Sequence, residues 1–370
     1  MLPPIYFYLF AGFAFVLGAA IGSFLNVCIY RMPRDLSVNE PKRSFCPSCK
    51  YQIPWHRNLP LISWLSLRGR CANCRESIPF RYFGVELLTG LLFLAVWLRV
   101  SPEHWVLALP YWILVSLFVV ATFIDFDFFI IPDEITWGGA IAGVLLSFAI
   151  PPLMGVQSNL TSGMWSVIGA AAGYFLLWGV VELGKLAFGK KRLTFETPQP
   201  FTWTRSGEDA ELIVGDEKQL WSEFFARETD RMLMSCDEIE VCGESFKGVP
   251  AEFHYNRVEI AGRSWDLITL DVIKGQLTEI TIPREAMGFG DVKFMATIGA
   301  FLGWKAVLFT VMSASMIGAV IGIATIALRR REWSAKIPFG PYLALGALIW
   351  LFRGPELVSW YWDLASPHNL

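Results

Sequence analysis

The sequence has few charged residues and few histidines, and it lacks the motifs of several common enzyme classes. Only 17% of its 370 residues are charged, and only four are histidine. The chain has no H-E-x-x-H motif, which excludes metalloproteases of that type, and no G-x-S-x-G motif, which excludes serine hydrolases with a nucleophile elbow. It also lacks the strand and glycine-rich turn that open a soluble Rossmann domain.

Apolar residues dominate what is present. Hydrophobic residues make up 54% of the chain and aromatic residues 15%, and a membrane-spanning helix needs about 20 consecutive apolar residues. This composition predicts an all-α polytopic membrane protein with about eight transmembrane helices. Two of the apolar runs are short, so seven spans, or a re-entrant element near 299–303, is the alternative. The candidate spans are residues 5–29, 82–98, 105–124, 135–154, 164–181, 292–304, 306–328 and 337–352.

The positions of Lys and Arg predict the orientation of these spans, because cytoplasmic loops near membrane ends are rich in both. Residues 31–81 contain ten of them, and residues 185–192 and 329–336 contain four each. The loops on the other side contain only Arg99, Lys305 and Arg353. With eight spans, both termini are expected on the outer, periplasmic side of the membrane.

Four of the seven cysteines form two C-x-x-C pairs, Cys46 with Cys49 and Cys71 with Cys74, separated by 21 residues. This spacing is close to that of zinc ribbons, and both pairs fall on the predicted reducing, cytoplasmic side. Four thiolates close a tetrahedral zinc site and leave no position open for water, so we expect a structural zinc ion. The metal would supply the folding free energy of this small loop.

A segment of 95 residues, 190–284, differs from the rest of the chain. It contains more than half of the 33 acidic residues and no membrane-length apolar run. Short alternating stretches at 210–214, 257–260 and 267–272 predict strands, while 221–234 is a candidate helix. We therefore expect an inserted, small β-rich soluble domain, which serves either recognition or spacing.

Acidic clusters at the ends of apolar runs are the most informative feature. Asp125-Phe126-Asp127 closes one run, Pro132-Asp133-Glu134 opens the next, and Gly288-Phe289-Gly290-Asp291 opens a third. Inserting an ionisable residue near the hydrocarbon of the membrane costs roughly 2.5–3.5 kcal/mol, so the presence of several such residues indicates a functional role. Two carboxylates at one membrane depth suggest an embedded aspartyl protease. From the residues alone, Asp125, Asp127 and Asp133 are about equally good candidates for the first catalytic aspartate.

Seven motifs follow one another along the chain: Gly22-Ser23-Phe24-Leu25-Asn26-Val27, Tyr30-Arg31-Met32-Pro33, the two cysteine pairs, Val85-Glu86-Leu87-Leu88-Thr89-Gly90, Ile124-Asp125-Phe126-Asp127, Gly288-Phe289-Gly290-Asp291-Val292-Lys293 and Ile337-Pro338-Phe339-Gly340-Pro341. Together they resemble the type IV prepilin leader peptidase and N-methyltransferase family. The resemblance covers roughly three quarters of the chain, and the insert is its main departure. Since an insertion in an exposed loop costs little closure free energy, the two halves can still meet.

The resemblance implies cleavage after the glycine of a short basic leader at the cytoplasmic face of the bacterial inner membrane, then methylation of the new N-terminus by S-adenosylmethionine. The implied substrates are prepilins and pseudopilins of type IV pili and type II secretion, and no nucleic-acid partner is expected. By the same resemblance, Asp125 and Asp291 form the catalytic dyad. The expected supporting residues are Gly288, Gly290, Lys293 and Asp133, and those expected near the methyl donor are Glu86, Asn26 and Arg31.

The expected organisation is a first span (1–30), a cytoplasmic zinc-binding loop associated with methyl transfer (31–81), spans with the first aspartate (82–189), the insert (190–284) and spans with the second aspartate (285–370). Two functions from other classes compete with the peptidase. A transporter or channel would use the carboxylates to bind ions. A noncatalytic scaffold would display the insert to a secretion assembly.

Overall fold

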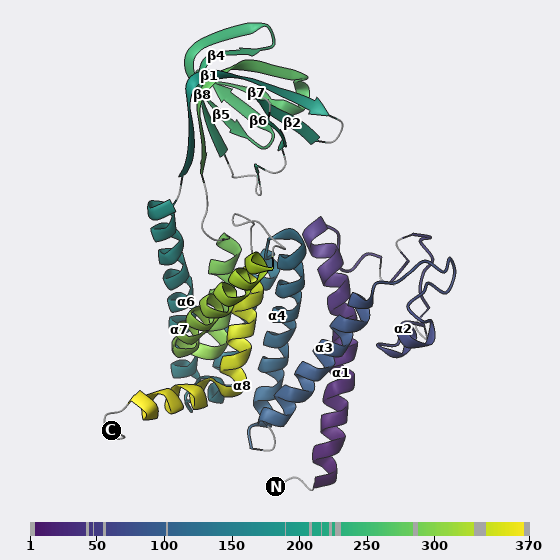
Figure 1. The fold of residues 1–370 in the computed structure, drawn as a ribbon. Helices are drawn as coiled ribbons and strands as arrows, with labels where there is room; N and C mark the ends of the chain where they lie inside the picture. Colours follow the sequence, from purple (N-terminus) through teal and green to yellow (C-terminus); the bar gives the residue numbers. More distant parts are fainter. Residues whose placement is uncertain are drawn as a thin grey trace. The chain divides into compact units, whose positions relative to one another are not determined.

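The computed structural model describes residues 4–41, 44–46, 48–54, 57–100, 103–188, 190–206, 209–215, 217–221, 224–225, 231–283, 288–328 and 338–365. The chain divides into two compact units (Figure 1). One unit combines Met1–Gly179 with Met287–Leu370, and the other is Val180–Ala286.

The first unit is helical. Within the described residues, five helices have the length and hydropathy to cross a membrane, over Ile5–Arg34, Phe80–Val100, Trp105–Phe128, Asn159–Gly184 and Phe289–Thr325. The elements are α1 (Pro4–Arg31), η1 (Met32–Arg34), α2 (Ile62–Ser66), α3 (Phe80–Val100), η3 (Trp105–Leu107), α4 (Ala108–Phe128), α5 (Asp133–Ala149), η4 (Pro151–Met154), α6 (Asn159–Phe188, which continues into the second unit), α7 (Phe289–Ala327) and α8 (Gly340–Ala365).

The predicted count of eight spans is not confirmed. Among the described residues, α5 has 17 residues, which is fewer than the roughly 20 that a membrane-spanning helix needs. The predicted spans 292–304 and 306–328 both lie in α7, which is interrupted at Gly303, where φ is 77° and ψ is 172°. This conformation is open to glycine but strained for residues with a Cβ. The two predicted spans, which are separated only by residue 305, therefore form the two parts of one interrupted helix, α7.

Small residues let the helices of this unit approach closely. A Cβ added to Gly22 in α1 would lie 2.8 Å from Glu86 Cα in α3. A Cβ added to Gly299 in α7 would lie 2.0 Å from the carbonyl oxygen of Gly169 in α6. Backbone contacts of this kind are a common way to pack helices in lipid, where the hydrophobic effect does not drive association. They fix α3 against α1 and α7 against α6.

The second unit is one antiparallel sheet of eight strands in the order β3-β2-β1-β8-β4-β5-β6-β7. Alternating residues are buried along β4, and they join a core that includes Trp203, Phe253 and Ile273. The strands are β1 (Lys190–Ser206), β2 (Asp209–Val214), β3 (Glu217–Leu220), β4 (Arg231–Val241), β5 (Glu244–His254), β6 (Arg257–Ile260), β7 (Arg263–Asp266) and β8 (Val272–Pro283).

The chain enters and leaves this unit on neighbouring strands, because Lys190 of β1 pairs with Pro283 of β8. An insertion whose ends lie side by side closes a loop at little cost to the helices on either side. The predicted strands at 210–214 and 257–260 are confirmed by β2 and β6.

Two local predictions for this unit are wrong. Residues 231–234 of the candidate helix belong to β4, and residues 267–269 of the third predicted strand form a 3-10 turn. In both places a short apolar run fits more than one period, and pairing with distant strands decides the outcome.

Candidate functional site

Two buried carboxylates lie at helix ends in the first unit. Asp125 is in the last turn of α4 and is 5% exposed, and Asp291 is in the first turn of α7 and is 6% exposed. In the part of the chain that the structure describes, no other acidic residue is buried to this degree. Burial of an ionisable group is costly, so these two positions are the strongest candidates for chemistry.

The start of α8 holds the Asp125 carboxylate in place. The backbone N–H of Gly340 donates a hydrogen bond to Asp125 Oδ2 at 2.9 Å. Gly340 is the first residue of α8, where backbone N–H groups have no partner within the helix and the helix dipole favours negative charge. A Cβ at Gly340 would lie 2.8 Å from Asp125 Oδ2, so this close approach requires glycine.

Ile131, in the connection between α4 and α5, links the two aspartate motifs. A Cβ on Gly340 would lie 3.0 Å from Ile131 Cδ1, and a Cβ on Gly290 would lie 3.3 Å from Ile131 Cβ. Gly290 directly precedes Asp291. The end of α4 and the starts of α7 and α8 therefore converge around one side chain, and they bring Asp125 and Asp291 to one region.

Aromatic packing within the helices supports the same arrangement. The rings of Phe118 in α4 and Phe294 in α7 meet edge to face, with centroids 5.8 Å apart. Both rings are fully buried. Because Phe118 lies two turns before Asp125 and Phe294 one turn after Asp291, this contact holds α4 and α7 side by side beneath the carboxylates.

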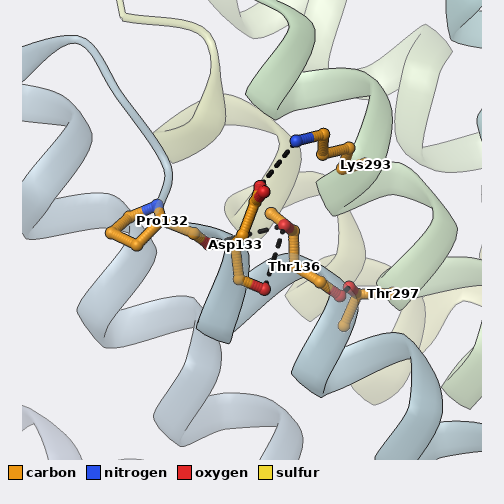
Figure 2. Close-up of polar contacts among 5 residues, drawn as sticks. All are labelled: Pro132, Asp133, Thr136, Lys293 and Thr297. Atoms are coloured by element: carbon orange, nitrogen blue, oxygen red, sulfur yellow. Dashed lines mark hydrogen bonds and ion pairs between the residues drawn. The ribbon is translucent and has the colours of Figure 1, made fainter.

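Asp127 and Asp133, the other two candidates for the first aspartate, are exposed and paired with basic residues. Arg81 of α3 contacts Asp127 Oδ2 at 2.5 Å, and Lys293 of α7 contacts Asp133 Oδ1 at 2.6 Å. Figure 2 shows the Lys293 side chain reaching from α7 to Asp133 at the start of α5. Of the three neighbouring aspartates, only Asp125 is therefore buried.

The expected supporting residues position α7 and Asp291. The Asp291 N–H donates to the Gly288 carbonyl at 3.1 Å, so the helix begins within the glycine motif. Lys293 joins α7 to α5 through Asp133, and one turn later Thr297 Oγ1 donates to the Thr136 carbonyl at 2.6 Å (Figure 2). These contacts fix the helix that carries Asp291 against α5.

The four cysteines predicted as zinc ligands lie together. Their sulfur atoms are all within 4.8 Å of one another, with Cys46 Sγ 3.8 Å from Cys74 Sγ and Cys49 Sγ 4.0 Å from Cys71 Sγ. A tetrahedral zinc ion with ~2.3 Å bonds to sulfur separates its ligands by roughly 3.8 Å. The donor set therefore fits structural zinc.

The two cysteine pairs sit in matching turns. Cys46 N–H donates to the Tyr51 carbonyl at 3.0 Å, and Cys71 N–H donates to the Glu76 carbonyl at 2.8 Å. The Tyr51 N–H and the Asn73 amide stabilise the thiolate of Cys49 and lower its pKa to about 6. In the same cluster, burial and the neighbouring thiols raise the pKa of Cys74. Thiolates are the form that binds metal, so a cation at this site would have to displace the proton of Cys74.

A cavity of about 310 Å³ lies between α1, α3 and the zinc-binding loop. All three residues expected near a methyl donor line it. Asn26 joins α1 to α3, while Glu86 and Arg31 hold the loop against the helices. Asn26 Nδ2 donates to the Tyr82 carbonyl at 3.0 Å, and Glu86 Oε2 accepts from the Leu61 N–H at 2.7 Å. The Arg31 guanidinium donates to three carbonyls of the loop, those of Ser37, Val38 and Pro41.

Sequence reasoning missed two contributors to this geometry. Gly340 lies in the motif Ile337-Pro338-Phe339-Gly340-Pro341, but the contact made by its backbone N–H leaves no signal of its own in a sequence. Arg81 follows the second cysteine pair and contacts Asp127 from 46 residues away. Arg81 directly precedes the predicted span 82–98, on the same predicted side of the membrane as the acidic clusters, and this position could have indicated an ion pair with one of them.

Two family profiles match the chain over most of the helical unit. The Bacterial Peptidase A24 N-terminal domain matches residues 16–100. The Type IV leader peptidase family matches residues 112–193 and 257–323, and the gap between these segments falls within the sheet unit. No solved structure matches.

Three relatives are each named prepilin leader peptidase/N-methyltransferase. The Aeromonas hydrophila protein is 31% identical, with 97% of this chain and 95% of the relative covered. The Myxococcus xanthus protein is 32% identical, with 97% of this chain and 77% of the relative covered. The Pseudomonas aeruginosa protein is 26% identical, with 95% of this chain and 93% of the relative covered. The chain belongs to the type IV leader peptidase family.

Proposed function

We propose that this protein is a bifunctional membrane enzyme that removes the leader of prepilins and pseudopilins and then methylates the new N-terminus. The observation that carries the proposal is the convergence of two buried aspartates, Asp125 and Asp291, around Ile131. The relatives that match nearly the full length are named for both activities.

Two carboxylates in one buried site suit peptide hydrolysis. One acts as base on the attacking water, while the other is protonated and polarises the scissile carbonyl. Neighbouring like charges do not both ionise readily, so the pair shares one proton and titrates as a unit. The hydrogen bond from the Gly340 N–H fixes the position of Asp125 Oδ2.

The cavity between α1, α3 and the zinc-binding loop is the proposed methyl-donor site. S-adenosylmethionine supplies an activated methyl group when it is bound there. The aromatic rings of Tyr82 and Trp64 line the cavity and suit a sulfonium cation, as does the carboxylate of Glu86. A zinc ion held by Cys46, Cys49, Cys71 and Cys74 would keep the loop folded over this cavity.

The proposed location is the bacterial inner membrane, with the zinc-binding loop and both aspartates at the cytoplasmic face and both termini outside. The Lys and Arg distribution supports this orientation. The Arg81–Asp127 ion pair also supports it, since it joins the start of α3, next to the zinc-binding loop, to the end of α4.

The proposed domains keep the expected boundaries, with 190–284 as an insert into the catalytic unit. The pairing of Lys190 with Pro283 supports these boundaries. The interruption of the family profile between residues 193 and 257 supports an insertion, although the profile resumes at β6 within the sheet. The insert serves recognition or spacing.

The test is cleavage of a prepilin-like substrate in membranes that contain the full-length protein. Asp125→Asn and Asp291→Asn should each abolish cleavage, whereas Asp127→Asn, an exposed and ion-paired control, should keep it. The variants should still methylate a substrate that has already been cleaved. Cleavage by Asp125→Asn at the wild-type rate would remove that residue from the dyad, and wild-type protein that transports ions without cleaving would favour a transporter.

A further inference from the structure

The last ten residues of α8 carry an exposed apolar stripe that the proposed reactions do not use. Leu357, Trp360, Tyr361 and Leu364 are 40%, 62%, 59% and 67% exposed. Their spacing of three, one and three residues places all four on one face of a helix. The polar residues Glu356, Ser359 and Asp363 lie together on another side of the helix. Trp362, which is 64% exposed, lies beside Ser359 and outside the stripe.

This segment turns away from the rest of α8. Pro355 lies inside the helix, where its ring and missing N–H bend the backbone. The preceding Gly354 packs against Trp350, since a Cβ on Gly354 would lie 2.4 Å from that indole ring. Figure 1 shows the final part of α8, in yellow, running across the end of the helical unit instead of continuing along it.

An ion pair indicates the membrane depth at which α8 bends. Arg99 contacts Glu356 Oε1 at 2.9 Å. Arg99 lies in the last turn of α3, one residue before the apolar helix ends at Val100. The turn of α8 therefore lies where α3 leaves the hydrocarbon, at the opposite end of α8 from Gly340 and Asp125.

We propose that residues 356–365 lie flat in the headgroup region of the leaflet opposite the aspartates, with the stripe inserted into lipid. The occupant is lipid because the stripe continues the apolar surface of membrane-spanning helices and consists of Trp, Tyr and Leu. Trp and Tyr favour the membrane interface, where the rings contact acyl chains and their polar groups reach headgroups. The segment contains no Lys or Arg, so its binding does not depend on anionic lipid.

The inference does not rest on the proposed function, and its test uses the intact protein in vesicles. An environment-sensitive fluorescent amino acid replaces Trp360 in one variant and Ser359 in a matched control. Vesicles of phosphatidylcholine carry bromine atoms either near the headgroup or near the acyl-chain end. We expect quenching at position 360 to be roughly threefold stronger than at position 359, with the shallow bromines more effective than the deep ones.

Equal quenching at the two positions would overturn the proposal, as would no quenching at either. A photo-crosslinking amino acid at position 360 separates lipid from a second copy of the chain. Adducts to lipid are expected, and a crosslinked dimer in their place would show that the stripe is a protein interface. Replacing a quarter of the phosphatidylcholine with phosphatidylglycerol should leave the quenching unchanged, whereas a marked increase would contradict an uncharged, aromatic anchor.

Discussion

Substitution of Gly340 by alanine tests how the first aspartate is held. A Cβ at this position would lie 2.8 Å from Asp125 Oδ2, whereas ordinary contacts begin at 3.4 Å, so the carboxylate or the start of α8 must move by about 0.6 Å. That movement weakens the hydrogen bond from the Gly340 N–H, which is 2.9 Å long.

A hydrogen bond to a charged group contributes about 1.5–3 kcal/mol, and a misplacement of about 1 Å in an active site can cost about 100-fold in rate. We therefore expect Gly340→Ala to lower kcat/KM for leader cleavage roughly 10- to 100-fold. Methylation of a substrate that is already cleaved should stay at the wild-type rate, because its proposed cavity lies between α1, α3 and the zinc-binding loop.

Gly138→Ala is the matched control. Gly138 lies in α5, and a Cβ there would meet nothing within 4 Å. Alanine also favours a helix over glycine by about 1 kcal/mol, so this variant should be fully active and at least as stable as wild type. Wild-type cleavage by Gly340→Ala would refute the proposed role of the Gly340 contact. Equal loss of cleavage and methylation would indicate general misfolding instead.

Three further predictions concern the zinc site, the helix packing and the insert. Cys49→Ser should lose bound zinc, measured by elemental analysis of the purified protein, and should lose methylation more than cleavage; full zinc content would exclude Cys49 as a ligand. Gly299→Leu should prevent stable folding in a thermal-shift assay, because a Cβ there would meet the Gly169 carbonyl at 2.0 Å, whereas Gly179→Leu, in open space, should fold normally. Deletion of residues 191–283 should leave cleavage of a simple prepilin-like substrate within roughly tenfold of wild type, since paired strand ends close the gap cheaply. Complete loss of cleavage in correctly folded protein would assign the insert a direct role.

Features of the structure that depend on residues close together in the sequence could be predicted from local sequence patterns. The cysteine spacing predicts the four-sulfur cluster because each turn is a local structure whose hydrogen bonds span five residues, such as Cys46 with Tyr51. Asp291 follows a glycine motif at the start of an apolar run, and the structure places it in the first turn of α7.

The choice among three nearby aspartates could not be made from local pattern. Asp127 and Asp133 are paired with Arg81 and Lys293, which lie 46 and 160 residues away. Only tertiary packing shows that these two charges are compensated at the surface while Asp125 is buried. The break in α7 was closer to prediction, because the sequence separates the runs 292–304 and 306–328 at Lys305 and the structure places the break two residues earlier, at Gly303.

The double variant Asp125→Asn with Asp291→Asn tests the central claim most directly. Groups that act as one catalytic unit have strongly non-additive effects, because removing either one already removes the shared function. Cleavage rates of the two single variants and the double variant should therefore be equal within error, at the same background level. If the double variant were slower than each single variant by the product of their separate effects, the two carboxylates would act independently and the shared-proton mechanism would be wrong.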